Sequence, residues 1–130
     1  MNGPGLQRRR PFLVLLCLVL WGGGLLVTHA PPARLPNFHV RDLLLHFVGY
    51  FVLGGIFWLC LLAFGVRRRR RILTVLLVLA AYGAFDELTQ PIFGRTASVA
   101  DWAADMAGTA AALLVGEMLV RLGGKRSGRQ

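Results

Sequence analysis

The sequence predicts an all-α integral membrane protein, a four-helix bundle of transmembrane helices joined by short loops. Hydrophobic residues make up 55% of its 130 residues, which is more apolar surface than a soluble domain of this size can bury. Four apolar stretches approach the ~20 residues that a helix needs to cross a bilayer. Basic residues are clustered beside these stretches. A lipid bilayer is therefore the environment that best explains this composition.

Each predicted span is an apolar stretch with basic or polar residues at its ends. In chain order, the four predicted spans are residues 11–28, 43–66, 72–90 and 102–122. The sequence therefore divides into a basic N-terminal segment (residues 1–10), a four-span membrane domain (residues 11–122) and a basic tail (residues 123–130).

The first span also has features of a secretory signal peptide. It follows a basic start and ends in Thr28-His29-Ala30, which resembles a cleavage site. Its apolar stretch is longer than the roughly 7–15 residues of such signals. Pro31 and Pro32, directly after the site, would hinder a peptidase. We therefore expect this span to remain as a membrane anchor.

Basic side chains concentrate on one side of the predicted membrane domain. All 15 Lys and Arg residues except Arg34, Arg41 and Arg95 lie in the N-terminal segment, the loop at residues 67–71 or the C-terminal end. Cytoplasmic loops of membrane proteins are enriched in Lys and Arg. We therefore expect both termini and the 67–71 loop in the cytoplasm, and the other two loops outside the cell membrane.

The placement of the charges and cysteines argues against a nucleic-acid-binding protein and against a disulfide or metal framework. A net charge of +9 would fit nucleic-acid binding, but these basic residues lie where they set membrane topology. We therefore expect the lipid bilayer, and no nucleic acid, as a partner. Cys17 and Cys60 lie inside apolar stretches without metal-site or disulfide spacing, so we interpret both as packing residues.

The second span begins with polar residues on one helical face. Asp42, His46 and Tyr50 recur every four residues, so their side chains stack on the same side of a helix. Each step descends about 6 Å along the axis, which places Tyr50 deepest. Taken singly, Asp42 would fit a helix N-cap, and His46 or Tyr50 a hydrogen-bonded core residue. The aligned set favours a shared polar site.

The third span meets acidic residues before it can cross the membrane. Its unbroken apolar part, residues 72–85, covers only about 21 Å at about 1.5 Å per residue. Asp86 and Glu87 are therefore expected just inside the outer leaflet, with Gln90 nearby. Charges there are costly unless they face a partner or a water-filled cavity. Carboxylates that merely ended a helix would oppose its dipole, so we favour a functional role.

The fourth span carries acidic and small residues on one face. Asp101, Asp105 and Gly108 share that face, and the many small residues around Gly108 permit close helix approach. Asp101 also fits an N-cap, which is a poorer explanation for Asp105. Near the other end, Glu117 precedes Arg121 by four residues, which predicts a structural ion pair.

Arg95, in the loop between the third and fourth spans, is the natural counter-charge for Asp86, Glu87 or Asp101. The remaining negative charge would be relieved by protonation or by a shared cation. The predicted polar pocket at outer-leaflet depth consists of Asp42, His46, Tyr50, Asp86, Glu87, Gln90, Arg95, Asp101 and Asp105.

The order and spacing of these residues resemble the VanZ-like family. The resemblance rests on Asp42-x-x-x-His46-x-x-x-Tyr50-x-x-Leu53-Gly54, on Asp86-Glu87-x-x-Gln90, and on Gly94-Arg95-x-x-Ser98-x-x-Asp101 followed by Gly108. It covers about residues 42–116 and implies a multi-pass membrane protein. The named member of that family is linked to resistance to the glycopeptide antibiotic teicoplanin, without an assigned reaction. Asp105 departs from the pattern, which has Asn there.

Two functions and one structural role fit these residues. The leading hypothesis is a pocket for a lipid or cell-envelope precursor head group, or for an amphiphilic antibiotic. The alternative is an intramembrane hydrolase or transferase acting on a lipid-linked substrate, with His46 as the candidate catalytic acid or base and Asp42 or Asp86 tuning it. In the third reading, the polar residues only lock the bundle.

The sequence contains none of the motifs that would settle the chemistry. It has no GxSxG elbow and no HExxH helix, and it identifies no cofactor. A divalent cation on the carboxylates would fit the enzymatic alternative. Because no metal-ligand motif is present, we predict no metal site.

Overall fold

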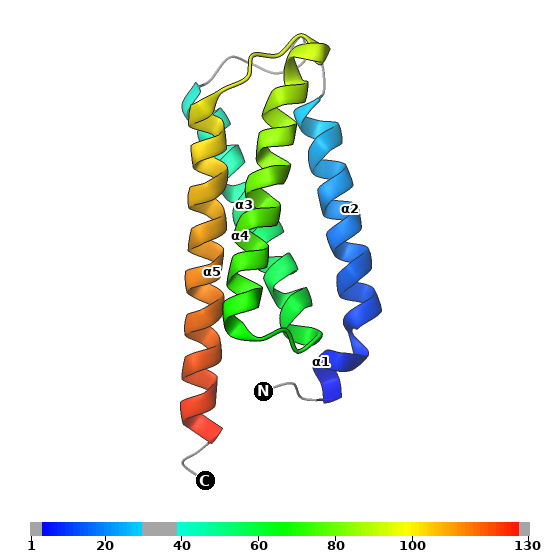
Figure 1. Ribbon diagram of the computed structural model, residues 1–130, viewed down its shortest axis with the longest axis vertical. Helices are drawn as coiled ribbons and strands as arrows, with labels where there is room; N and C mark the ends of the chain where they lie inside the picture. The colour runs from blue at the N-terminus through cyan, green and yellow to red at the C-terminus, as the bar shows by residue number, and fades with distance from the viewer. Residues whose placement is uncertain (1–3, 30–38, 128–130) are drawn as a thin grey trace.

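The computed structural model describes residues 4–29 and 39–127, and this part of the chain consists of helices joined by short loops. Its elements, in chain order, are α1 (Pro4–Arg8), α2 (Arg10–Thr28), α3 (His39–Ala63), α4 (Arg68–Thr89), the 3-10 helix η2 (Gln90–Phe93) and α5 (Val99–Ser127). Figure 1 shows the four long helices as a bundle in which successive helices run in opposite directions. The predicted all-α four-helix bundle is confirmed.

All four predicted spans correspond to helices that are long and apolar enough to cross a membrane. The first span agrees with α2 to within one residue, and the ends of the other three differ from the prediction by several residues. The 67–71 arginine run was predicted to be a loop, but α4 begins within it, at Arg68, because arginine is a good helix former. The fourth helix begins at Val99, earlier than predicted, and the short α1 was not predicted.

The bundle has two chemically different ends. The polar end comprises the last turns of α2 and α4 and the first turns of α3 and α5. The arginine end, where α1 lies, comprises the first turns of α2 and α4 and the last turns of α3 and α5 (Figure 1). At the arginine end Gly65 has φ 76°. Val66 N–H donates to Leu61 C=O at 3.0 Å, which ends α3 and reverses the chain.

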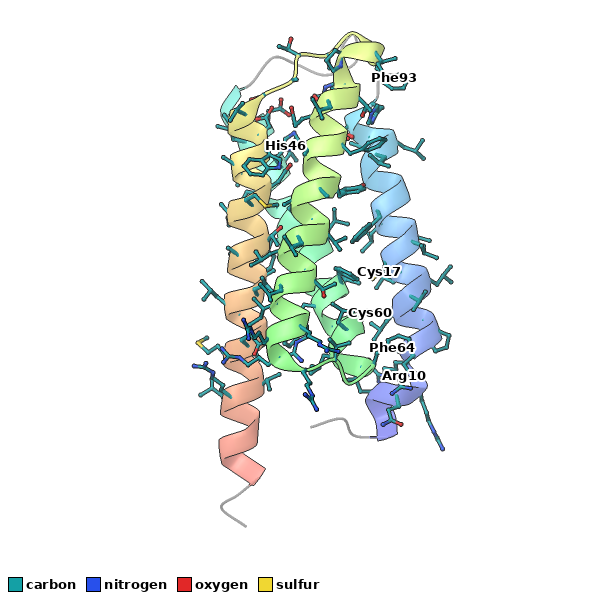
Figure 2. The ribbon with its side chains drawn as sticks, viewed as in Figure 1. Arg10, Cys17, His46, Cys60, Phe64 and Phe93 are labelled. Carbon is teal, nitrogen blue, oxygen red and sulfur yellow. The ribbon has the colours of Figure 1, made fainter. Side chains whose placement is uncertain are left out.

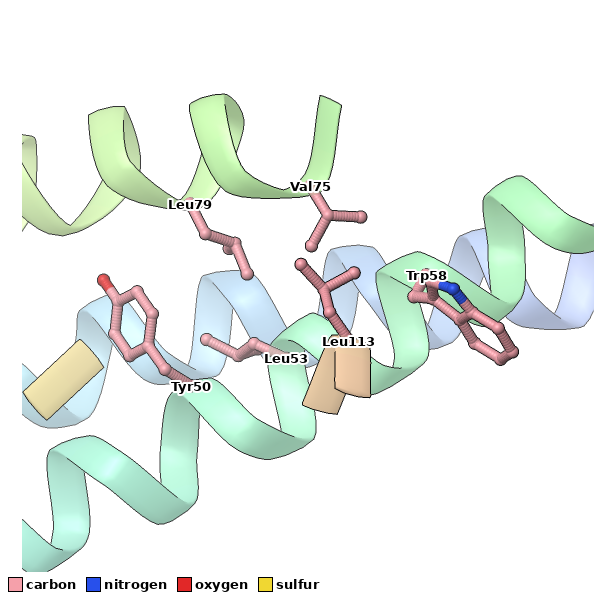
Figure 3. Packing of buried hydrophobic residues seen from close by; sticks show 6 residues of the cluster. All are labelled: Tyr50, Leu53, Trp58, Val75, Leu79 and Leu113. Carbon is pink, nitrogen blue, oxygen red and sulfur yellow. The ribbon is translucent and has the colours of Figure 1, made fainter. Parts of the chain in front are cut away.

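The core lies between α3, α4 and α5. Its buried apolar side chains, shown in Figure 3, are Tyr50, Leu53, Trp58, Val75, Leu79 and Leu113. Helix α2 packs on this core through partly buried side chains such as Leu20 and Trp21. The Tyr82 hydroxyl donates to the Trp21 carbonyl, which ties α4 to α2.

Helices α3 and α5 make the most extensive contact in the bundle, and Gly108 is at its centre. A Cβ at Gly108 would overlap the carbonyl oxygen of Phe47 and lie 3.0 Å from the backbone nitrogen of Phe51. The predicted close approach at Gly108 is therefore confirmed. Further along the same interface, the ring of Trp58 covers Gly116, so only small residues fit beneath it.

Large apolar side chains cover the outside of the bundle. Leu18 on α2 is 66% exposed, Leu77 on α4 is 69% exposed and Leu114 on α5 is 74% exposed. A monomeric soluble protein rarely exposes apolar surface on this scale. Lipid acyl chains are the environment that these faces fit, which agrees with the four membrane-spanning helices.

Glu117 is the buried centre of an ionic cluster at the arginine end. It accepts hydrogen bonds from Arg71, from Trp58 Nε1 at 2.9 Å and from Arg68 Nε at 2.9 Å. The prediction of a structural ion pair at Glu117 holds, but the predicted partner was wrong. Arg121 is exposed, and α4 supplies the counter-charges instead.

Helix α2 is attached to α3 at the same end. Arg10 Nε donates to the Ala63 carbonyl at 3.0 Å, and its guanidinium lies 5.0 Å from the centre of the Phe64 ring (Figure 2). Cys60 is buried and Cys17 half-buried, both as free thiols in this interface. These positions agree with the interpretation of both cysteines as packing residues.

Candidate functional site

The predicted pocket residues of α3, α4 and α5 all lie toward the polar end, where Figure 2 labels His46. Apart from Tyr50, they form two groups of neighbouring polar side chains. The first group joins α3 to α5 and contains Asp42, His46, Asp101 and Asp105, with Arg95 beside it. The second joins α4 to α2 and to the 94–98 loop, and it contains Asp86, Glu87 and Gln90.

His46 and Asp105 form the innermost pair of the first group. His46 Nδ1 lies 2.9 Å from Asp105 Oδ1, and the side chains are 5% and 0% exposed. In the neutral tautomer whose Nδ1–H donates to this carboxylate, the ring orientation is fixed and the lone pair is on Nε2. The pairing was not predicted, because His46 and Asp105 lie on different helices and are 59 positions apart in the sequence.

Asp42 and Asp101 lie next to His46. One carboxylate oxygen from each and a ring nitrogen of His46 are all within 4.8 Å of one another. Arg95 Nη2 is 3.7 Å from Asp42 Oδ2. Arg95 was expected to pair with Asp86, Glu87 or Asp101, and it contacts Asp42 instead because the 94–98 loop crosses from α4 toward the start of α3 and α5.

Neither Asp42 nor Asp101, for which an N-cap role was the alternative explanation, occupies the cap position. Helix α3 begins at His39, so Asp42 lies within its first turn. Helix α5 begins at Val99, and its cap is Ser98, whose Oγ accepts the Asp101 N–H at 3.2 Å. Both carboxylates still lie at the positive end of a helix dipole, where negative charge is stabilised.

Asp86 connects α4 to the end of α2. The Thr28 hydroxyl donates to Asp86 Oδ1 at 2.6 Å, and His29 Nδ1 lies 3.5 Å from the same oxygen. His29 Nε2 is also 2.8 Å from the Thr89 hydroxyl. These contacts fix α2 against α4. Sequence reasoning missed Thr28 and His29, although polar residues at the end of an apolar span are a recognisable signal.

Glu87 connects α4 to the 94–98 loop. Its Oε2 accepts the Ser98 N–H at 2.6 Å, and its Oε1 accepts from Gln90 Nε2 at 3.2 Å. Gln90 also donates to Asp86 at 3.3 Å and is almost fully buried. Gln90 therefore holds the two neighbouring carboxylates in place, and Gly94, with φ 75°, allows the loop to turn back over them.

An open groove of about 280 Å³ lies beside Glu87, between α4 and the start of α5. Its lining combines one carboxylate with apolar and small residues, namely Ala84, Glu87, Leu88, Ala97, Ser98, Val99 and Trp102. A second groove of about 400 Å³ at the arginine end is lined by Arg68, Arg69, Ile72 and Leu73. That second groove is one face of a single helix, so it lacks the enclosing elements of a site.

Three buried polar atoms have no hydrogen-bond partner among the described residues, and two of them, the Tyr50 hydroxyl and Asp105 Oδ2, lie at the polar end; the third is Trp21 Nε1 on α2. A Cβ at Gly83 would lie 3.1 Å from the first and 3.0 Å from the second. Gly83 therefore makes room for both side chains between α3, α4 and α5. Sequence reasoning missed this glycine because it lies in an otherwise ordinary apolar stretch.

No hydrogen bond or ion pair joins the first group to the second within residues 42–123, whose side chains are described. Chemically, the first group offers an oriented imidazole with adjacent carboxylates. The second offers a carboxylate beside an apolar groove. An ionised carboxylate has about four acceptor positions, so Glu87 retains acceptor capacity for a ligand beyond its two internal contacts.

Comparison with known proteins identifies the family. The model of the VanZ/LLP1 family matches residues 12–120, which includes the first span as well as the three spans that carry the polar groups. Neither the curated proteins nor the solved structures contain a match to the chain. The chain, a multi-pass membrane protein with four spanning helices, therefore belongs to the VanZ/LLP1 family.

Proposed function

We propose that the polar end binds the head group of an amphiphile at the outer face of the cell membrane. The observation that carries this proposal is the groove of about 280 Å³ beside Glu87. Its apolar wall, with Leu88, Val99 and Trp102, suits an acyl or prenyl tail. The Glu87 carboxylate suits a head group that donates hydrogen bonds through hydroxyl, amide or ammonium groups.

A lipid, a lipid-linked precursor of the cell envelope and an amphiphilic glycopeptide all share this chemistry. The expected orientation places the groove where such molecules are found, because the basic residues favour both termini in the cytoplasm. Resistance to teicoplanin, the role linked to the named VanZ-like protein, is the physiological outcome that we propose to test first.

The test compares teicoplanin susceptibility of bacteria expressing wild-type protein, Glu87→Gln or Arg69→Gln at equal membrane levels. Gln at position 87 keeps an acceptor oxygen for the Ser98 N–H, so the fold is expected to survive while head-group binding weakens. Arg69 is exposed at the other end and serves as the control. Wild type and Arg69→Gln should raise the inhibitory concentration, and Glu87→Gln should not. Equal susceptibility of all three strains and the empty vector would contradict the proposal.

An intramembrane hydrolase or transferase is the second candidate, and the His46–Asp105 pair favours it. A carboxylate on Nδ1 holds Nε2 ready to act as a general base. Asp42 or Asp86 was expected to tune His46, and Asp105 contacts it instead. His46→Ala should abolish turnover of a lipid-linked substrate with the fold intact if the protein is an enzyme. It should leave partial function in a binding protein, and it should unfold the bundle if the residues are only a structural lock.

A further inference from the structure

The first polar group contains an arrangement of ligand atoms that head-group binding does not use. Asp42 and His46 are one turn apart on α3, and Asp101 faces them from the first turn of α5. One potential ligand atom from each lies within 4.8 Å of the other two. Ligands about 2.0–2.2 Å from a Zn²⁺ ion are at most about 4.4 Å apart, so small rotations of the two aspartate side chains would bring all three atoms onto one ion.

His46 is oriented as metal-bound histidines usually are. A metal-ligating histidine almost always donates its other ring N–H to a carboxylate or a carbonyl. Here Nδ1 contacts Asp105 Oδ1 at 2.9 Å, in a pair that is more than nine-tenths buried. Nε2 has no hydrogen-bond partner among the side chains of residues 42–123. The His46 side chain is 5% exposed, and an unpartnered ring nitrogen on so buried a side chain is a sign of a ligand beyond the nearby carboxylates.

The local charge also favours a cation. Asp42, Asp101 and Asp105 contribute three carboxylates around one imidazole, and Arg95 is the single arginine in contact with them among the described side chains. Its Nη2 is 3.7 Å from Asp42 Oδ2, which is too long for a strong hydrogen bond. Carboxylates at a membrane boundary are costly without compensation, and a divalent ion would neutralise two of them.

We propose that Asp42, His46 and Asp101 bind a divalent transition-metal ion, with Asp105 positioning His46. One imidazole and two carboxylates suit Zn²⁺ or Mn²⁺ better than Mg²⁺ or Ca²⁺, which prefer only oxygen ligands. Three protein ligands leave at least one coordination position for water. The proposal departs from the sequence prediction of no metal site, because ligands divided between α3 and α5 form no linear motif.

Metal binding and general-base catalysis would both need the same nitrogen of His46. If Nε2 of His46 binds the metal, it cannot also accept a proton from a substrate. The proposal is independent of head-group binding at Glu87, because Glu87 is not a ligand and lies in the second polar group.

The test measures Zn²⁺ binding to detergent-purified, chelator-stripped protein by titration calorimetry against a competing chelator. We expect one Zn²⁺ per chain, with Mg²⁺ and Ca²⁺ unable to displace it. Removing a ligand in His46→Ala or Asp42→Asn should weaken binding at least about tenfold, and Asp105→Asn should weaken it about 10–100-fold. His29→Gln changes a histidine at the same end that contacts Asp86 and Thr89 and not the proposed ligands, so it is the matched control and should bind as wild type does.

Asp42→Asn keeps the proposal falsifiable if His46→Ala does not fold, because the Asp42 side chain is 42% exposed. Arg95→Gln gives a change in the opposite direction. It removes a cation that shares Asp42, so it should tighten Zn²⁺ binding several-fold, which an unfolded protein would not do. Unchanged affinity in Asp42→Asn and Arg95→Gln, or loss of binding in His29→Gln alone, would overturn the proposal.

Discussion

Replacing Glu117 with Gln should destabilise the bundle strongly. Glu117 is 7% exposed and Arg71 is 4% exposed, and the Arg71 guanidinium also lies 5.2 Å from the Trp58 ring. Breaking a buried ion pair by removing one partner costs about 3–5 kcal/mol, because the other charge stays buried without compensation. Gln keeps an acceptor for the Trp58 N–H, so we expect the lower end, about 3 kcal/mol.

The assay is reversible unfolding of detergent-solubilised protein, followed by circular dichroism as a denaturing detergent is added. Arg121→Gln is the matched control, because it removes the partner that sequence spacing favours. Arg121 is exposed, so its replacement should change the free energy of unfolding by about 0.5 kcal/mol or less. The double variant Glu117→Gln with Arg71→Gln should lose less stability than the two single losses combined. A loss below about 1 kcal/mol for Glu117→Gln would mean that the buried Arg71 charge does not depend on Glu117.

Two further predictions concern packing and topology. Gly108→Ala should cost about 1–3 kcal/mol, because its Cβ would collide with the α3 backbone. Gly55→Ala, where a Cβ meets nothing within 4 Å, should be neutral or stabilising in the same unfolding assay. Thr96→Cys, in a variant lacking Cys17 and Cys60, should react with a membrane-impermeant maleimide on intact cells, and labelling only after permeabilisation would reverse the predicted orientation. Gly94 is a poorer labelling site because its φ of 75° strains any other residue.

The spans were predictable because lipid imposes a simple rule on the sequence. A helix that crosses the hydrocarbon must be apolar over about 20 residues, so hydropathy alone located α2 to α5. Gly108 was predictable for a similar reason, since small residues at helical spacing mark close contact. The polar character of the end that carries Asp86 and Glu87 followed from the short apolar part of the third span.

Side-chain partners were not predictable in the same way. The i,i+4 rule favoured Arg121 for Glu117, but Arg71 on α4 is buried against it. Loop position suggested Asp86, Glu87 or Asp101 for Arg95, but the contact is with Asp42. Asp105, where the resemblance implied Asn, is the residue that orients His46. These pairings depend on how three helices are rotated about their axes, which the sequence of one chain does not specify.

Head-group photocrosslinking tests most directly whether the polar end is a binding site. Protein in liposomes would be irradiated with a phospholipid that carries a diazirine in its head group, and the modified peptides would be mapped by mass spectrometry. The binding proposal predicts that labelling concentrates in residues 84–102, that excess unlabelled lipid competes, and that Glu87→Gln reduces the labelling several-fold while Arg69→Gln does not. Labelling spread equally over both ends of the bundle, or unchanged in Glu87→Gln, would contradict it.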